Sequence, residues 1–520
     1  MFSRVLIPLG AAVLTYAQSV TPIVDIGYAI HQASLLKSTN TYYNFSNIRF
    51  AAPPVGELRF QGPVDPPGNR SAGIQDGTYG PICPQIYPNW VSTGLSTTND
   101  SSVEIHTSDD NESEDCLFLD VVVPEKIFES RNFGSGSPVM VWIYGGGYVA
   151  GDKLTGFNPV GLLDRSKQSV IYVAMNYRLG AFGFLAGPSL QTNGTANVGL
   201  LDQRFALQWV QKYIHLFGGD PNRVTVFGES AGGGSIMHQI TAYGGRNGRS
   251  PFQQAISMSP GFYPLPGNYA PEVSLQQFLK AANVSTVQEA RQLSSAALIQ
   301  ANSEVVSLAP YGSFIFGPSV DGDLIPAMPG KLLLQGSFDH KGLTFANPAI
   351  ANDSAFAAAI KSWLPTASEA IVSYLATTLY PPIFDGSQDY TTMLSRVALA
   401  IGEMEIACNA GFLAQAFSGL GSRAYLFSVP PGRHGTDTPY AFYTSGPFPG
   451  VENGTLAMIL QDYFTQFAVT GDPNIPGITP NFPLYGKEST VLNMNSTFIS
   501  PLPDPAANPR CSWWQEALFV

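Results

Sequence analysis

The sequence predicts an α/β protein built on one large, mostly parallel sheet that is flanked by helices. Four apolar runs, at residues 117–123, 139–144, 169–177 and 223–228, are nearly continuous rather than alternating, as strands buried on both faces should be. Between the last two runs, residues 197–217 carry apolar side chains mostly at helical spacing, and the GGDP segment at 218–221 ends this helix. A strand, a helix and a strand in this order predict parallel pairing through a right-handed crossover.

The second half of the chain is richer in helix patterns. Apolar residues recur three and four positions apart at residues 274–284, 286–295, 395–417 and 456–471. We expect these helices to pack on the predicted sheet.

The composition is that of a globular protein with a large core. Of 520 residues, 44% are hydrophobic and only 12% are charged, a balance that excludes the disordered class. The net charge of -12 and the lack of any basic run argue against nucleic acid as a partner, because such binding depends on Lys and Arg. No repeat or low-complexity linker divides the chain, so we expect a single domain over residues 18–520.

The first 17 residues have the features of a secretory signal peptide. Arg4 precedes an apolar run at residues 5–14, and small residues follow up to Ala17. The run is too short to anchor the chain in a membrane, and we find no later stretch of about 18 apolar residues. We therefore expect a soluble, secreted chain that begins near Gln18 and has no stable membrane anchor.

Two further features fit the secretory pathway. Nine N-x-S/T sequons predict glycosylation, at Asn44, Asn69, Asn99, Asn111, Asn193, Asn283, Asn352, Asn453 and Asn495. The four cysteines, Cys83, Cys116, Cys408 and Cys511, include no C-x-x-C pair. An even number of cysteines in an oxidising compartment favours two disulfides over a metal site.

A candidate nucleophile stands in the segment FGESAGGG at residues 227–234. The strand VTVF precedes it and the helical run SIMHQITAY follows it, as a nucleophile elbow requires. The glycines permit the strained turn that lifts the Ser230 hydroxyl above the sheet, and the helix directs free N–H groups toward the site. The alternative is a glycine-rich turn that carries an uninvolved serine.

His434 is the candidate base for Ser230. It stands in a Pro/Gly-rich loop after a predicted strand, where its side chain can project over the carboxyl edge of the sheet. Its position also satisfies the serine, acid, histidine order of the α/β hydrolases. His31 and His106 precede the predicted sheet, His215 lies on the crossover helix, and His238 lies two turns into the helix after Ser230; His340 is the one other candidate.

An attacked ester carbonyl becomes an oxyanion, which requires N–H donors placed in advance. The segment YGGGY at residues 144–148 follows a strand, and its glycines let the backbone approach a ligand. Ala231, directly after the serine, supplies a further donor. The alternative for YGGGY is a simple turn at the end of a strand.

The chain resembles the type-B carboxylesterases, the family of cholinesterases and fungal esterases and lipases. Residues 217–233 (FGGDPNRVTVFGESAGG) and 114–124 (EDCLFLDVVVP) are similar to its two signatures, and RFAAPPVGELRF, NYRLGAFGFL, PSVDGDLIP, PPGRHGTDTPY and RCSWWQEALF extend the likeness over the chain. The resemblance implies an α/β-hydrolase fold, no cofactor and no metal. It also implies disulfides that join Cys83 to Cys116 and Cys408 to Cys511.

Site roles follow from the same resemblance. It implies that Ser230 is the nucleophile, His434 the base, and Glu229 a neighbouring acid that tunes the pocket. The oxyanion donors are then Gly145, Gly146 and Ala231. The implied function is a secreted carboxylic ester hydrolase that works through an acyl-enzyme on small-molecule or lipid esters.

The chain departs from the family pattern after DGDLIP. The expected strand V-x-x-M-x-G-x-N and the glutamate that orients the catalytic histidine are missing, and Lys341 stands before the glycine where that glutamate is expected. No Glu occurs in residues 305–368, so Asp339 and Asp353 are the nearest substitutes, and His340 fits a loop residue better than a base. A splice variant, a faulty gene model and a catalytically impaired or non-catalytic relative are the alternatives.

The segment between Cys83 and Cys116 bears on the substrate. Its apolar residues Ile86, Tyr87, Trp90 and Val91 are followed by a stretch rich in Ser, Thr and Asp. A lipase lid needs an apolar face, so we expect a preference for soluble or short-chain esters.

Overall fold

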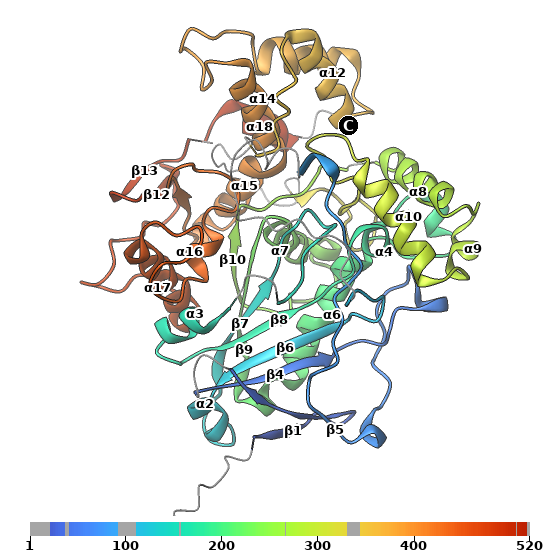
Figure 1. Cartoon of the computed structure of the whole chain (residues 1–520). Helices are drawn as coiled ribbons and strands as arrows, with labels where there is room; N and C mark the ends of the chain where they lie inside the picture. The colour runs from blue at the N-terminus through green and yellow to red at the C-terminus, as the bar shows by residue number, and fades with distance from the viewer. Residues whose placement is uncertain are drawn as a thin grey trace, which may run out of the picture.

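The computed structural model describes residues 21–36, 41–91, 111–154, 158–265, 267–329, 344–505 and 507–516. The predicted signal peptide, Asn99, His106, Asp339, His340 and Lys341 lie outside these residues. Figure 1 shows a central sheet with helices packed around it and a further group of helices above its upper end.

The main sheet has seven strands in the order β10-β9-β7-β8-β6-β4-β3. Their bounds are β3 Ser34–Leu35, β4 Tyr42–Arg49, β6 Phe118–Pro124, β7 Ser137–Ile143, β8 Ile171–Met175, β9 Gly219–Glu229 and β10 Gln254–Met258. The four strands from β8 to β10 pair in parallel, whereas β3, β4 and β6 pair antiparallel. The α/β prediction is confirmed, with a mixed sheet. A continuous apolar run indicates burial on both faces but not strand direction, and β6 is fully buried although antiparallel.

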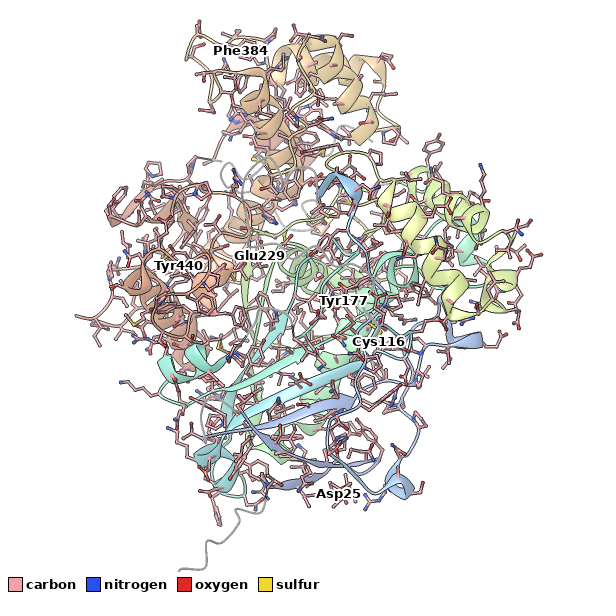
Figure 2. The ribbon with its side chains drawn as sticks, viewed as in Figure 1. Asp25, Cys116, Tyr177, Glu229, Phe384 and Tyr440 are labelled. Atoms are coloured by element: carbon pink, nitrogen blue, oxygen red, sulfur yellow. A yellow bond between two sulfur atoms is a disulfide. The ribbon has the colours of Figure 1, made fainter. Side chains whose placement is uncertain are left out.

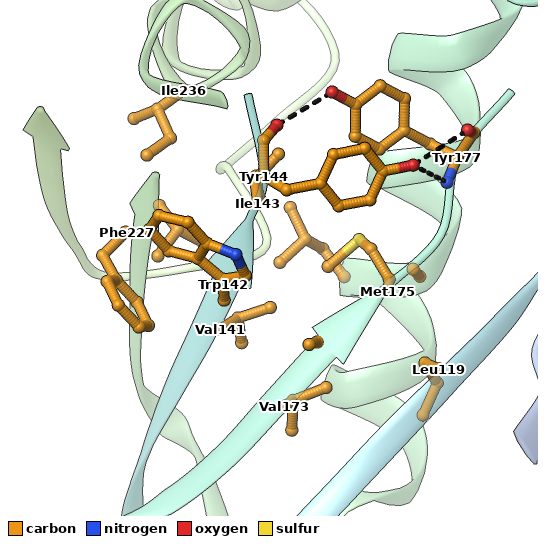
Figure 3. Close-up of a cluster of buried hydrophobic side chains, with 14 of the residues drawn as sticks. Leu119, Val141, Trp142, Ile143, Tyr144, Val173, Met175, Tyr177, Phe227 and Ile236 are labelled. Atoms are coloured by element: carbon orange, nitrogen blue, oxygen red, sulfur yellow. Dashed lines mark hydrogen bonds between the residues drawn. The ribbon is translucent and has the colours of Figure 1, made fainter. Parts of the chain in front are cut away.

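Aromatic side chains fill the core beside β7. The ring of Trp142 lies 4.9 Å from those of Phe227 and Phe442. Tyr144 follows the last residue of β7, and its ring stacks on that of Tyr177 with 4.4 Å between the ring centroids. Each tyrosine hydroxyl donates to the backbone carbonyl of the other residue (Figure 3). These contacts fix the backbone where the YGGGY loop begins.

The predicted helices are confirmed, with shifts of a few residues at their ends. The first group comprises α3 Val160–Arg165, α6 Val198–Tyr213, α7 Ala231–Thr241, α8 Tyr269–Ala281, α9 Val287–Arg291, α10 Ser295–Ser307 and α17 Gly454–Thr470. Caps formed by Ser, Thr and Asn start several of them, as at Thr286, whose side chain accepts from the backbone N–H of Glu289.

The upper helices form a second hydrophobic cluster. They comprise α12 Asp353–Trp363, α13 Glu369–Tyr374, η6 Leu375–Leu379, α14 Met393–Gly402, η7 Glu403–Ala407, α15 Cys408–Ala416 and α18 Pro509–Glu516. The predicted helix at 395–417 is α14, η7 and α15 in succession, where η7 is a π-helical turn.

The helix Met393–Ala416 is also long and apolar enough to cross a membrane. In the described part of the chain it is the one helix that passes this test by length and composition, and 83% of its apolar window is buried inside the protein. Because a core helix of a soluble protein passes the same test, this gives only weak evidence for a membrane span.

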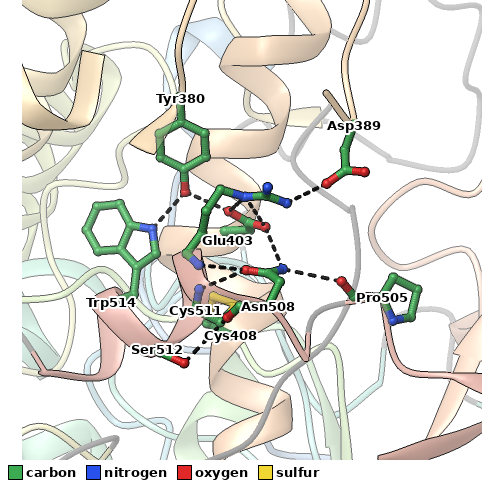
Figure 4. A network of polar contacts seen from close by, with 10 residues as sticks. Tyr380, Asp389, Glu403, Cys408, Pro505, Asn508, Cys511, Ser512 and Trp514 are labelled. Carbon is green, nitrogen blue, oxygen red and sulfur yellow. Dashed lines mark hydrogen bonds and ion pairs between the residues drawn. A yellow bond between two sulfur atoms is a disulfide. The ribbon is translucent and has the colours of Figure 1, made fainter. Parts of the chain in front are cut away.

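Both predicted disulfides are present. Cys83 is bonded to Cys116 and Cys408 to Cys511. The second bond holds α18 on α15, and a polar network reinforces it (Figure 4). In this network Arg510 pairs with Glu403 and Asp389, and the Tyr380 hydroxyl donates to the same glutamate.

Six strands stand outside the main sheet in two small sheets. The first small sheet is β1 Ile23–Asp25, β2 Ile30–Gln32 and β5 Ile74–Gln75, and the second is β11 Tyr425–Phe427, β12 Thr490–Met494 and β13 Ile499–Pro503. Among the described residues no strand joins β10 to β11. The main sheet therefore has β10 as an edge strand, and the second small sheet has β11 as an edge strand.

Candidate active site

Ser230 occupies a sharp turn between β9 and α7. Its φ of 57° and ψ of -123° lie where a non-glycine residue is strained. Three backbone hydrogen bonds hold the turn: its N–H donates to the Met258 carbonyl at 3.0 Å, and its carbonyl accepts from Gly234 at 2.9 Å and Gly261 at 2.8 Å. This geometry is that of a nucleophile elbow at the carboxyl end of a central strand.

Two glycines allow the elbow to pack against β7. A Cβ on Gly232 would lie 2.0 Å from the Ile143 carbonyl oxygen, and one on Gly228 would lie 2.6 Å from the same atom. Both clashes are with backbone, which cannot move aside as the end of a side chain can. The GxSxG spacing therefore has a steric cause in this fold.

The YGGGY loop lies directly against the elbow. A Cβ on Gly145 would stand 2.8 Å from the Ser230 Cβ and 2.7 Å from the Glu229 carbonyl oxygen. Gly146 has a φ of 108°, and its carbonyl accepts from Val149 and Ala150. Within the described chain the N–H groups of Gly145, Gly146 and Ala231 donate to no protein group, so they can serve a ligand.

His434 reaches the site from the loop after β11. Its Nε2 atom lies 3.3 Å from Oε1 of Glu229, and the two side chains are only 9% and 12% exposed. A Cβ on Gly435 would lie 3.6 Å from the same glutamate oxygen. Figure 2 shows Glu229 between the sheet and the upper helices, in the middle of the molecule. The contact brings the acid that precedes Ser230 to the candidate base.

Aromatic side chains form a wall beside this pair. The Phe345 ring lies 5.3 Å from the His434 ring, and Trp90 contacts both Phe345 and Phe314. Tyr87 belongs to the same region, because its hydroxyl would lie 3.3 Å from a Cβ on Gly146. Burial, and secondarily the charge of Glu229, raise the pKa of Tyr87 to about 12, so its hydroxyl stays protonated at neutral pH.

An aliphatic side chain completes the surroundings of the serine. A Cβ on Gly261 would lie 3.7 Å from both the Ser230 Oγ and the Ile406 Cγ1. Ile406 lies in the π-helical turn η7, far from Ser230 in sequence. Sequence reasoning missed Phe314, Phe345 and Ile406, because no local pattern links these positions to the elbow.

The structure gathers most of the predicted site residues and removes one candidate. Ser230, Glu229, Ala231, Gly145 and Gly146 lie together, and His434 joins them through its contact with Glu229. Their catalytic roles stay predictions. Asp353 lies elsewhere, at the start of α12, where its carboxylate pairs with Arg396 at 2.6 Å and is 60% exposed.

Comparison with known proteins identifies the family. A model of the carboxylesterase family matches residues 31–514.

The chain belongs to the carboxylesterase family.

Relatives and a solved structure agree with this membership. The chain is 40% identical to carboxylesterase patB of Penicillium expansum over 546 aligned positions, covering 96% of each protein, and 31% identical to lipase 4 of Diutina rugosa over 86% of each. Its structure matches the crystal structure of Aspergillus niger EstA with a TM-score of 0.79 and 25% identity, over 96% of this chain and 99% of that one. The carboxylesterase is thus a carboxylic ester hydrolase with the α/β-hydrolase fold.

The alignment to patB also contains positions that no residue of this chain occupies. Because 96% of 520 residues is about 499 residues, about 47 of the 546 aligned positions contain no residue of this carboxylesterase. Segments present in that relative are therefore absent here.

Proposed function

We propose that this carboxylesterase is a secreted serine esterase that forms an acyl-enzyme on Ser230. The observation that carries the proposal is the strained elbow of Ser230. Gly145 packs against this elbow, and His434 contacts Glu229, the residue that precedes the serine. A serine with this backbone geometry, beside glycine N–H groups that donate to no group among the described residues, fits acyl transfer.

Two steps follow from the arrangement. The Ser230 hydroxyl attacks the ester carbonyl while His434 takes its proton, and the alcohol leaves with that proton, so that the acyl group remains on the serine. Water then repeats the sequence and releases the acid. In both steps the carbonyl oxygen becomes negatively charged, and the N–H groups of Gly145, Gly146 and Ala231 can stabilise that charge.

Glu229 contributes charge rather than a bond to substrate in this scheme. When His434 accepts a proton it becomes an imidazolium, and the carboxylate 3.3 Å away stabilises that cation. We place Glu229 as a positioning residue for the base.

Two tests address the esterase proposal. A fluorophosphonate probe should label the wild-type protein at Ser230 and leave Ser230→Ala unlabelled. Hydrolysis of p-nitrophenyl acetate and butyrate should fall by at least about a thousandfold in the same variant, since nucleophile removal in serine hydrolases costs that much or more. Equal labelling of both proteins would refute Ser230 as the nucleophile.

Secretion is the second part of the proposal. Support comes from the two disulfides and from five described sequon asparagines that lie exposed, Asn69, Asn111, Asn193, Asn283 and Asn352. Asn453 and Asn495 are only partly exposed, and their side-chain amides donate to the carbonyls of Ser496 and Ser428; the exposed Asn193 donates its amide to the Gln288 side chain. Expression in a fungal host should place the protein in the medium, with glycans at the exposed sites that endoglycosidase digestion and mass spectrometry can locate.

We further propose soluble or short-chain esters as the preferred substrates. The sequence after Val91 is rich in Ser, Thr and Asp, and a segment of that composition lacks the apolar side chains with which a lid contacts a lipid droplet. Comparing p-nitrophenyl butyrate with emulsified triolein tests this, and a strong rise in rate at the droplet surface would contradict it.

A catalytically impaired enzyme is the second candidate function. Among the described residues no strand lies between β10, whose last residue is hydrogen-bonded to Ser230, and β11, which precedes the His434 loop, and this observation favours it. An impaired enzyme should be labelled at Ser230 by fluorophosphonate yet turn over esters little faster than Ser230→Ala. Sequencing the transcript across codons 336–345 shows whether the natural message encodes an additional segment there.

A further inference from the structure

A short segment at the end of β10 holds the elbow of Ser230 by two hydrogen bonds. The N–H of Ser230 donates to the Met258 carbonyl at 3.0 Å, and the N–H of Gly261 donates to the Ser230 carbonyl at 2.8 Å. Because these bonds involve both the N–H and the carbonyl of the serine, the place of this segment sets the place of the serine backbone. We call residues 258–262 the bracing segment.

The elbow and the bracing segment each contain a strained residue. Ser230 has a φ of 57° and Ser259 a φ of 45°, which lie in the left-handed region that non-glycine residues rarely occupy. Such conformations persist only where the surrounding structure holds them. The elbow is held by the bracing segment, so the bracing segment needs a support of its own.

That support comes from η7 and the first turn of α15. The N–H of Phe262 donates to the Glu405 carbonyl at 3.3 Å. The side-chain amide of Asn409 donates to the same carbonyl at 2.6 Å, and it also donates to the Pro260 carbonyl at 3.5 Å, the long limit of a hydrogen bond. Asn409 thus contacts the bracing segment at Pro260, and it shares the acceptor that Phe262 uses.

The alternative is a purely local role for Asn409. It stands four residues after Glu405, and a polar side chain at this spacing can bond the preceding turn of its own helix without any wider effect. Two observations favour a wider role. The Glu405 carbonyl also accepts from the bracing segment, and the Asn409 amide reaches a carbonyl 149 positions earlier in the chain. Asn409 is only 6% exposed, so its amide depends on these acceptors rather than on solvent.

The helical side of the contact is itself fixed. Cys408, directly before Asn409, is bonded to Cys511 of α18, and Glu403 of η7 pairs with Arg510 of the same helix (Figure 4). η7 is a π-helical turn, a distortion that is frequent at functional sites. An anchored element therefore stands behind the Asn409 amide, as the support of a strained site requires.

Packing confines the bracing segment on both sides. The Phe262 ring lies 4.7 Å from the ring of His238 in α7. A Cβ on Gly261 would lie 3.7 Å from the Ser230 Oγ and 3.7 Å from the Ile406 Cγ1 of η7. The segment lies between the elbow and η7, so we expect a shift on the η7 side to be passed on to Ser230.

We propose that Asn409 is a positioning residue for Ser230, which it holds in its strained conformation through the bracing segment. In this role the amide contacts no substrate. The effect on catalysis rests on the proposed function, because it requires Ser230 to be the nucleophile. The effect on the backbone of the bracing segment does not.

Asn409→Leu tests the proposal, because leucine has a similar size and no donor. The variant should lower both kcat for p-nitrophenyl butyrate and the rate of fluorophosphonate labelling of Ser230 by at least about tenfold, since a misplacement of about 1 Å can cost roughly a hundredfold in rate. KM should stay within about twofold of the wild-type value, because substrate contacts are unchanged. An unchanged kcat would overturn the proposal.

Gln461→Leu is the matched control. The Gln461 amide is also buried and also donates to two backbone carbonyls, those of Ala441 and Tyr443, but it belongs to α17. Urea unfolding should show a loss of stability in both variants, whereas only Asn409→Leu should lower kcat. Equal fractional losses of kcat in the two variants would indicate a general effect of a lost buried amide and would refute a positioning role.

Asn409→Ser provides a conservative variant that should fold even if Asn409→Leu does not. Its hydroxyl can donate to the Glu405 carbonyl four residues earlier, but it is too short to reach Pro260. Stability should therefore be close to that of the wild type, while kcat should remain lower. A wild-type kcat in Asn409→Ser would leave Asn409 with its local bond alone and would overturn the proposal.

Hydrogen exchange measures the bracing segment without any ester. In Asn409→Leu, peptides that span residues 258–262 should exchange at least about tenfold faster than in the wild type, because local opening becomes easier when a support is lost. Gln461→Leu should leave this exchange unchanged. Equal exchange in the wild type and Asn409→Leu would overturn the proposal even if activity fell. Faster exchange in a protein whose wild type hydrolyses no ester would refute the esterase function alone.

Discussion

The carboxylate of Glu229 lies 3.3 Å from Nε2 of His434, although the strands that lead to them, β9 and β11, belong to two different sheets. Glu229 ends β9 directly before the candidate nucleophile, and His434 follows β11. The fold thus brings a carboxylate to the candidate base from the nucleophile's own turn.

Replacing Glu229 by Gln should lower kcat more than it raises KM. The amide keeps the shape but cannot stabilise an imidazolium, and interactions with a charged group contribute about 1.5 to 3 kcal/mol, or roughly tenfold to a hundredfold in rate. Glu229→Asp should retain more activity than Glu229→Gln. Steady-state kinetics on p-nitrophenyl butyrate measure both, and equal kcat in wild type and Glu229→Gln would remove Glu229 from the mechanism.

Gly145→Ala should lower kcat by more than its loss of folding stability would explain. The new Cβ would press on the Ser230 Cβ and the Glu229 backbone, and such overpacking costs about 1 to 3 kcal/mol and displaces the elbow. Gly68→Ala is the matched control, because nothing lies within 4 Å of its Cβ. Thermal unfolding and kcat, measured on both variants, separate an effect on stability from one on catalysis. An unchanged kcat in Gly145→Ala would show that the YGGGY loop lies too far from the reacting atoms to affect catalysis.

Asp353→Asn should leave kcat/KM unchanged and lower stability slightly. Its carboxylate pairs with the buried guanidinium of Arg396 on the upper helices, and a pair with one exposed partner contributes at most about 1 kcal/mol. Urea unfolding and ester kinetics on the same preparation test this. A drop of about four orders of magnitude in kcat, as expected for loss of a triad acid, would instead restore Asp353 as a catalytic candidate.

Folding stability should fall as the pH drops below 6.5. Burial lowers the pKa of His238 to about 3 and that of His31 to about 4, from 6.5. Both pKa values are lower in the folded state than in the unfolded state, so between pH 6.5 and pH 3 to 4 the unfolded chain binds more protons. The stabilisation is therefore complete above pH 6.5 and decreases as the pH falls through this range.

The loss from pH 7 to pH 5 should be about 2 kcal/mol for each histidine. Denaturant unfolding at both pH values measures it, and His238→Leu should show a smaller loss than wild type by about that amount. Identical losses in the two proteins would mean that His238 does not titrate between the folded and unfolded states as proposed.

Local sequence patterns predicted most of the strands and helices. The buried runs at 139–144 and 169–177 became β7 and β8, and the long apolar pattern at 395–417 became α14 to α15. The direction of β6 did not follow from its run, because a strand buried on both faces looks the same parallel or antiparallel.

The sequence by itself determined the elbow, the glycine loop, the candidate base and both cysteine pairs, because each depends on short-range backbone geometry or on a family pattern. Only the tertiary structure decided which acid meets His434, which side chains wall the site, and that β10 and β11 face each other across a cavity. These relations join residues as far apart in sequence as Trp90 and Phe345, and no local spacing encodes a contact that exists only after the strands and helices have packed.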